Sequence, residues 1–70
     1  MFSKKNLKVG DMVIFCDGKS HRDYPEYYPP IGTVGVIQGC ECGDYLIQWP
    51  DGTTSLEDKW FCGKNQIHKR

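Results

Sequence analysis

Segment 45–53, with the sequence YLIQWPDGT, constrains the fold of this chain more than any other stretch. Tyrosine, isoleucine and tryptophan occupy alternate positions of 45–49, which is the period-two pattern of a β-strand with one buried face. The Pro-Asp-Gly sequence at 50–52 predicts a tight turn, because proline presets its own φ and Gly52 supplies a positive φ. Residues 53–56 are then predicted to return as a second strand, so that the two strands form a hairpin.

Three further stretches have the length and composition of short strands. Residues 12–16 and 32–38 are mostly apolar, and 65–67 is a closing strand that we expect to run antiparallel to the first. Residues 56–63 fit either one helical turn or a continued strand. The predicted fold is all-β: a small barrel of about five short antiparallel strands, with a long loop after strand one and no helix beyond a turn or two. The expected core contains Val13, Phe15, Val34, Val36, Ile47 and Ile67.

The chain between the first two predicted strands, residues 17–31, has the composition of a long loop. Pro25, Pro29 and Pro30 each remove a backbone donor, and a central strand does not tolerate that density of proline. A loop of this length in a small domain usually carries function. A second loop, flanked by glycines, is predicted at 39–44.

The whole chain, residues 1–70, is expected to form a single domain with flexible basic ends at 1–8 and 68–70. A chain of 70 residues buries about 60% of its unfolded surface, which leaves no room for both a core and a deep catalytic cleft. We therefore expect no enzyme active site. The net charge of zero provides no overall field that attracts nucleic acid or an anionic membrane. The N-terminal lysines are not followed by an apolar run, so the predicted compartment is the cytoplasm.

Four cysteines raise the question of a metal site. Cys40 and Cys42 are separated by one residue, whereas tetrahedral zinc sites usually use Cys-x₂₋₄-Cys spacing. In an antiparallel barrel, Cys62 is expected near Cys16 at one end, with the other two thiols toward the opposite end. We therefore predict two separated thiol pairs, and neither a metal nor a cofactor. A nucleophilic role for Cys16 with His21 is not expected, because no helix N-terminus is predicted that would lower the pKa of the thiol.

Four short motifs within residues 9–67 carry a resemblance to a known family. They are Gly-Thr-Val-Gly at 32–35, Ile-Gln-Trp at 47–49, Asp-Gly-Thr at 51–53 and Trp-Phe-Cys-Gly at 60–63. Together they resemble the SH3-like repeat of mind bomb ubiquitin ligases, and are more loosely similar to chromo-like and KOW-type barrels. The resemblance implies an SH3-like barrel and, as a class of function, the binding of peptide segments. The acidic, proline-rich segment 23–30 departs from the family pattern, so no ligand residue of the family is carried over.

The aromatic residues of segment 24–30 are the main candidates for a partner-binding site. A proline-interrupted loop cannot bury three tyrosines together, and exposed tyrosines offer large contact area with few rotatable bonds. We expect a groove between this loop and the two tryptophans, and the predicted partner-binding residues are Tyr24, Tyr27, Tyr28, Pro29, Pro30, Trp49 and Trp60. Asp23 and Glu26 favour a partner segment that is basic or donates hydrogen bonds. Two alternatives stay open: a homodimer through the same loop, and tyrosines that fold back as a lid over the core.

A second hypothesis of function uses the basic residues near the two ends of the chain, which are Lys4, Lys5, Lys8, Lys69 and Arg70. Pairing of the first and last strands would gather them at one basic pole that contacts phosphates. Such a pole suits a nucleic-acid or ribosome-associated barrel of the KOW type. Net neutrality and the clustered aromatic residues favour the first hypothesis, a non-enzymatic protein- or peptide-binding module.

Overall fold

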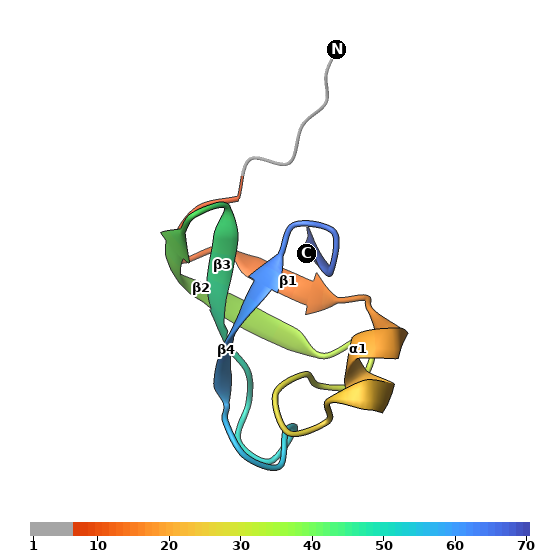
Figure 1. Cartoon of the computed structure of the whole chain (residues 1–70). Coiled ribbons are helices and arrows are strands. Elements are labelled where there is room, and N and C mark those ends of the chain that lie inside the picture. The colour runs from red at the N-terminus through yellow and green to blue at the C-terminus, as the bar shows by residue number, and fades with distance from the viewer. Residues whose placement is uncertain (1–6) are drawn as a thin grey trace.

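In the computed structural model of this chain, residues 7–70 are described, and they form one sheet and one short helix (Figure 1). The elements in chain order are β1 (Met12–Phe15), α1 (Gly18–Asp23), β2 (Val34–Glu41), β3 (Asp44–Gln48), β4 (Lys59–Gly63) and β5 (Ile67–Lys69). The fold is therefore mostly β, with five short antiparallel strands, as the sequence predicts.

The strands lie in the order β4-β3-β2-β1-β5, so the first and last strands are neighbours. They run antiparallel with Phe15 opposite Ile67, which confirms the expected pairing. The barrel, which the sequence predicted as closed or half-closed, is not closed, because β4 and β5 are the two edges of the sheet and no pairing joins them in the described part of the chain. At the turn between these strands, the amide of Gly63 donates to Oε1 of Gln66, and the carbonyl of Gly63 accepts from the amide of Gln66.

The connection between β2 and β3 is a two-residue turn instead of the predicted loop 39–44. Both central residues have positive φ, 52° at Cys42 and 85° at Gly43, which is the signature of a type I′ hairpin. Strand β2 therefore continues to Glu41 and includes Cys40. The register of β2 against β3 shifts between Ile37 and Gly39, which marks a β-bulge.

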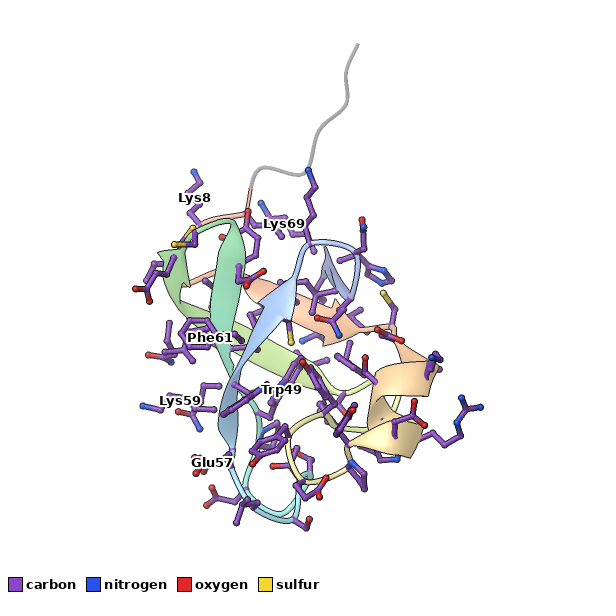
Figure 2. The ribbon with its side chains drawn as sticks, viewed as in Figure 1. Lys8, Trp49, Glu57, Lys59, Phe61 and Lys69 are labelled. Carbon is purple, nitrogen blue, oxygen red and sulfur yellow. The ribbon has the colours of Figure 1, made fainter. Side chains whose placement is uncertain are left out.

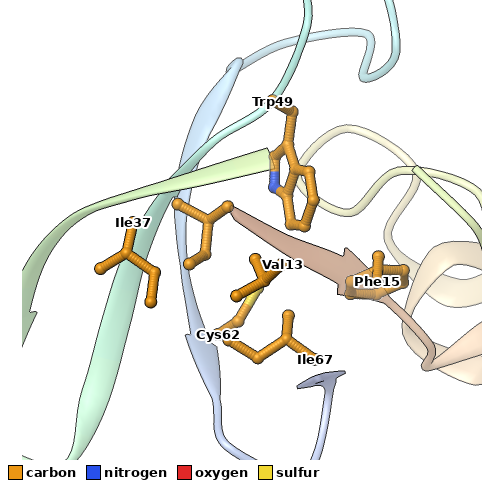
Figure 3. Packing of buried hydrophobic residues seen from close by; sticks show 7 residues of the cluster. Val13, Phe15, Ile37, Trp49, Cys62 and Ile67 are labelled. Carbon is orange, nitrogen blue, oxygen red and sulfur yellow. The ribbon is translucent and has the colours of Figure 1, made fainter. Parts of the chain in front are cut away.

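The core lies on the inner face of the sheet (Figure 3). Its buried members are Val13, Phe15, Ile37, Ile47, Trp49, Cys62 and Ile67. Four of the six predicted core residues are among them, but the prediction for Val34 and Val36 is wrong. Their neighbours Gly35 and Ile37 take the inner positions of β2 instead. The outward-facing Val34 and Val36 pair with Ile14 and Met12 of β1, so the outer face of the sheet is also partly apolar. The sequence pattern of β2 therefore does not show which of its two faces is buried.

Trp49 (Figure 3) is the largest buried side chain, and its ring packs directly over the backbone of Gly35. A Cβ atom built on Gly35 would lie 2.5 Å from Cε3 of Trp49, so only glycine fits under the indole ring. Phe15 meets the same ring edge-on, with 5.7 Å between ring centroids. The predicted period-two pattern of residues 45–49, with Ile47 and Trp49 buried, is therefore confirmed.

The return strand is displaced from its predicted position. Residues 53–56 form bends, and the strand that pairs with β3 is β4, with Gln48 opposite Lys59. The turn itself is as predicted, because Gly52 has a φ of 86° and the amide of Thr53 donates to the carbonyl of Pro50 at 3.2 Å. The hairpin loop is therefore long, and residues 50–58 lie outside the sheet.

Helix α1 lies within segment 17–31, which the sequence predicted as a loop throughout. Its six residues stay within the expected limit of a turn or two. Asp17 caps the helix by accepting hydrogen bonds from the amide of Ser20 at 3.2 Å and from its hydroxyl at 2.7 Å. Gln66 donates to Asp17 at 3.1 Å and to Ser20 at 2.9 Å, so the cap also fixes α1 to the turn before β5. These hydrogen bonds, the one from the Ser20 hydroxyl above all, lower the pKa of Asp17.

The C-terminal end differs from the predicted flexible tail, whereas residues 1–6 of the predicted N-terminal tail lie outside the described residues. Residues 68 and 69 belong to β5, and the amide of Arg70 donates to the carbonyl of Met12 at 3.0 Å. Lys4 and Lys5, which the sequence placed in the basic pole, lie outside the described residues. Within residues 7–70, no helix is long and apolar enough to span a membrane.

Candidate functional site

Two loops that are far apart in the sequence are joined by main-chain hydrogen bonds. The carbonyl of Glu26 accepts from the amides of Leu56 at 3.2 Å and Glu57 at 3.1 Å, and the carbonyl of Pro25 accepts from the amide of Ser55 at 3.4 Å. The loop after α1 is thus held against the loop between β3 and β4. The pairing was not visible in the sequence, because the residues involved have no shared pattern.

Aromatic side chains lie on these joined loops and on the adjacent edge strand. Tyr27 stacks on Trp60 of β4, with 4.1 Å between ring centroids and 25° between ring planes. Tyr24 is 58% exposed, and its carbonyl accepts from the amides of Tyr27 and Tyr28, which fixes the turn. We call Tyr24, Tyr27 and Trp60 the aromatic platform. Its two stacked members are half-buried, so the platform is ordered by its own contacts while one tyrosine stays accessible.

Two of the seven predicted partner-binding residues are part of the core instead. Trp49 is 1% exposed and Pro29 is fully buried, so neither side chain can contact a partner. Tyr28 stacks on Phe15 with 5.8 Å between centroids and packs against the core. The expectation that both tryptophans line a groove with this loop is therefore wrong for Trp49, because its ring faces inward over Gly35.

The lid alternative accordingly holds for part of the loop. Tyr28 and Pro29 close over the core, and the ring of His21 bonds the carbonyl of Tyr28 at 2.9 Å. Pro30 is exposed, and its carbonyl accepts from the hydroxyl of Thr33 at 2.8 Å. The loop is thus divided between a buried half and an exposed half that carries Tyr24.

The joined loops beside the aromatic platform are acidic, whereas Lys59 precedes Trp60 on β4. Residues 23–58 contain no lysine or arginine and seven acidic residues: Asp23, Glu26, Glu41, Asp44, Asp51, Glu57 and Asp58. Glu41 and Asp44 flank the turn between β2 and β3, and the other five belong to the joined loops or the end of α1. Asp23 is paired with Lys19 and Arg22, at 3.9 and 3.3 Å. Figure 2 shows Glu57 at the end of the molecule opposite to Lys8 and Lys69.

The basic pole is partly neutralised by an acidic residue. The ammonium group of Lys69 lies 3.7 Å from the carboxylate of Asp11, which also accepts from the backbone amide of Lys8 at 3.0 Å. Lys8 and Lys69 do lie at the same end of the molecule (Figure 2). Glu41 is at that end as well, at the β2–β3 turn.

The cysteines have two kinds of environment. Burial raises the pKa of the Cys62 thiol to about 12, with smaller contributions from the negative charges of Asp17, Asp44 and Cys16. The other three cysteines are exposed and free. Among residues 7–70, no group of three or more His, Cys, Asp or Glu side chains is placed to hold a metal ion.

One feature near Cys16 differs from the sequence prediction. Helix α1 begins at Gly18, so a helix N-terminus does follow this thiol closely. The thiol of Cys16 lies 4.0 Å from the carbonyl of Asn65, and the His21 ring is bonded to a different carbonyl, that of Tyr28. Nδ1 of the candidate base His21 is therefore bonded to a carbonyl and not to the Cys16 thiol.

Two exposed apolar residues outside the aromatic platform, Leu56 and Phe61, were not among the predicted partner-binding residues. Leu56 is 63% exposed beside the backbone of Glu26, and Phe61 is 39% exposed on the outer face of β4. The exposure of Leu56 could have been predicted from its position between polar residues in a loop. For Phe61, the signal is its position between Trp60 and Cys62, which point to the inner face.

No protein-family model matches this chain, and comparisons with curated proteins and with solved structures find no match. The resemblance to the mind bomb-type repeat thus has no support from a family match. The fold and the site geometry therefore carry the functional argument.

Proposed function

We propose that this chain is a non-enzymatic module that binds a basic, extended segment of another protein through the aromatic platform. The observation that carries the proposal is the combination of exposed Tyr24 and the Tyr27–Trp60 stack with two joined loops, 24–33 and 49–58, that contain four acidic residues and no lysine or arginine. Aromatic rings supply apolar contact area, and cations are attracted to their faces. The carboxylates of Glu26 and Glu57 provide the complementary charge.

Preorganisation supports this assignment. Hydrogen bonds to the carbonyls of Pro25 and Glu26 hold the loop against residues 55–57, so a partner would not have to order it. A loop that is already ordered loses less conformational entropy on binding. The division of the loop also supports the proposal, because Tyr28 and Pro29 anchor it to the core while Tyr24 remains free to make contacts.

We also propose that the fold is an open member of the SH3-like class. The strand order brings β1 and β5 together, a long segment follows β1, and β2, β3 and β4 follow one another as antiparallel neighbours. This layout supports the resemblance of the sequence motifs to the mind bomb-type repeat. Binding of a peptide segment by such a repeat is the same class of function that the aromatic platform favours.

The alternative function, nucleic-acid binding of the KOW type, has less support. Its basic pole includes Lys69, whose charge is offset by Asp11 at 3.7 Å, and Glu41 lies at the same end. A phosphate-binding surface depends on uncompensated positive charge, and its affinity falls steeply with salt. The aromatic platform, in contrast, has an acidic surrounding that repels phosphate.

A selection from a random peptide library tests the proposal. The immobilised wild-type chain is the bait, and the Trp60→Ala variant is used for counter-selection, so that only peptides that need the platform are kept. We expect enriched peptides with net positive charge, and a loss of affinity of about tenfold or more for Trp60→Ala, as for a hot-spot aromatic residue. Enrichment of acidic peptides, or equal binding by both proteins, would contradict the proposal. Salt-sensitive binding of an RNA or DNA oligonucleotide in place of peptides would favour the alternative.

A further inference from the structure

Strand β4 is an edge of the sheet, and the direction of its backbone groups follows from one hydrogen bond. The amide of Trp49 donates to the carbonyl of Asp58 at 2.7 Å, just beyond the pair Gln48 and Lys59. Hydrogen-bonded and non-hydrogen-bonded pairs alternate along an antiparallel ladder. The backbone groups of residues 60 and 62 therefore face β3, and those of residues 59, 61 and 63 face away from the sheet.

One of these three outward-facing residues is already satisfied within the chain. The amide of Gly63 donates to Oε1 of Gln66 at 2.8 Å, and its carbonyl accepts from the amide of Gln66 at 2.9 Å. Lys59 and Phe61 remain as the residues whose amides and carbonyls face outward along the edge. Both residues are exposed, and an edge of this kind is a template for pairing with another strand.

We propose that β4 pairs antiparallel with β4 of a second copy of this chain, about a two-fold axis at Trp60. In this register Lys59 of each copy lies opposite Phe61 of the other, and all four outward-facing groups of each copy are hydrogen-bonded. A register centred on Phe61 would instead place Lys59 opposite Gly63, whose groups are occupied by Gln66. The two-fold at Trp60 is therefore the antiparallel arrangement that uses the free edge completely.

The side chains fit the same arrangement. Trp60 points to the inner face with Ile47, and a two-fold at this residue brings the exposed parts of two indole rings next to each other. On the outer face, Phe61 lies beside the aliphatic stem of Lys59 from the second copy. This contact covers part of a phenyl ring that is 39% exposed in the single chain.

Charge complementarity favours the second copy as the occupant. One end of β4 is preceded by Glu57 and Asp58, and the other end is followed by Lys64. Antiparallel pairing places the acidic end of one copy beside the basic end of the other, on both sides of the axis. An edge contact of this size covers less than the roughly 800 Å² per partner of a standard interface, so we expect association in the micromolar to millimolar range.

Sedimentation equilibrium over micromolar to millimolar concentrations, combined with amide hydrogen exchange, tests the proposal on the full chain. We expect a monomer–dimer equilibrium, with slower exchange of the Lys59 and Phe61 amides as the concentration rises. The variant Phe61→Pro removes an outward-facing amide without removing a bond to β3, and should weaken dimerisation by about tenfold or more. Phe61→Ala keeps the amide and should weaken it much less. Tyr24→Ala should leave it unchanged.

A second variant keeps the test decisive if proline prevents folding. Chemical synthesis with a ligation at Cys62 gives a chain with N-methylated Phe61, which changes a single amide that does not face β3. We expect it to fold and to remain monomeric at concentrations where wild type dimerises. A wild-type chain that stays monomeric at all concentrations would overturn the proposal. So would a dimer that Tyr24→Ala abolishes and that N-methylation leaves intact, because that result assigns the contact to the loop.

Discussion

The two tryptophans of this chain have opposite environments although they lie near each other in sequence and at the same end of a hairpin. Trp49, directly after β3, is 1% exposed and packs over Gly35 and against Phe15. Trp60, in β4, is half-buried and stacks on Tyr27. The first ring fills the core, and the second supports the exposed platform.

The difference follows from what faces each ring. Gly35 leaves room for an indole ring on the inner face of the central strand β2, and neighbouring strands enclose it on both sides. Trp60 belongs to an edge strand, where the loop that carries Tyr27 supplies the cover. The same side chain therefore contributes stability at one position and a binding surface at the other. The predictions below test this division.

Removing the buried ring should have the largest effect. Trp49→Ala should cost about 3–5 kcal/mol, as expected for a large aromatic residue truncated in a core. A domain of this size has about 3–5 kcal/mol of stability in total, so we expect an unfolded chain by circular dichroism. Trp49→Phe is the matched control, because it keeps an aromatic ring and removes an indole N–H that is buried without a hydrogen-bond partner. A folded Trp49→Ala with an unchanged melting temperature would refute the structural role of this ring.

The glycine beneath Trp49 provides the next largest effect. Gly35→Ala places a methyl group 2.5 Å from the indole ring and should destabilise the fold by about 1–3 kcal/mol in urea denaturation, as for an overpacked core. Gly39→Ala is the control on the same strand, because its Cβ meets nothing closer than Leu46 at 3.9 Å. Equal stability losses for the two variants would show that backbone conformation, and not contact with Trp49, explains the requirement at position 35.

Truncation of the half-buried ring should separate binding from stability. Trp60→Ala should cost only about 1 kcal/mol of folding free energy, while affinity for a basic peptide falls about tenfold or more. Calorimetric melting and peptide titration measure the two quantities on the same sample. Phe61→Ala is the neighbouring control for binding, since this ring lies on the opposite face of β4. If Trp60→Ala lowered the free energy of unfolding by several kcal/mol, Trp60 would be a core residue like Trp49, and the aromatic platform would serve stability and not binding.

A pH effect at the α1 cap should be the smallest. The pKa of Asp17 is lowered in the folded state, chiefly by the Ser20 hydroxyl, so its carboxylate stabilises the fold above the unfolded pKa of 3.8. This contribution is lost as the pH falls through the folded pKa, because the unfolded chain then binds the proton more readily. Asp17→Asn should therefore show a shallower loss of stability than wild type when melting is followed downward from about pH 5. Identical pH profiles would show that the cap contributes no pH dependence.

The strand content of this fold was predictable because its signals are local. The alternation that ends in Trp49 and the positive φ at Gly52 both follow from residue types. The phase of β2 was not predictable, since Val34 and Val36 are apolar although they face outward. Helix α1 has a weak signal, an aspartate three residues before Ser20 with a glycine at its first position. Helices are usually recognised in a sequence by the periodicity of an apolar face, and α1 has no buried residue that would give such a pattern.

The candidate site depends on contacts that no local pattern encodes. The sequence placed Trp49 both on the buried face of its strand and among the partner-binding residues, and the packing of its ring on Gly35 decides for the core. The return strand was predicted at residues 53–56 but lies in β4, and this difference also follows from a long-range contact. Residues 55–57 bond the backbone of residues 25 and 26, and this contact removes them from the sheet. The prediction that a proline-interrupted loop cannot bury all three tyrosines is confirmed, because Tyr24 is exposed.

The division between the two tryptophans is tested most directly by the two indole N–H signals in a ¹H–¹⁵N correlation spectrum. The probe is a net-positive peptide enriched by the selection described above, added stepwise to the wild-type chain, with Trp49→Phe used to assign the signals. We predict that the Trp60 indole signal shifts progressively until saturation while the Trp49 signal stays in place. A shift of the Trp49 signal with an unchanged Trp60 signal, or no shift of either at saturating peptide, would contradict the assignment of the platform as the binding surface.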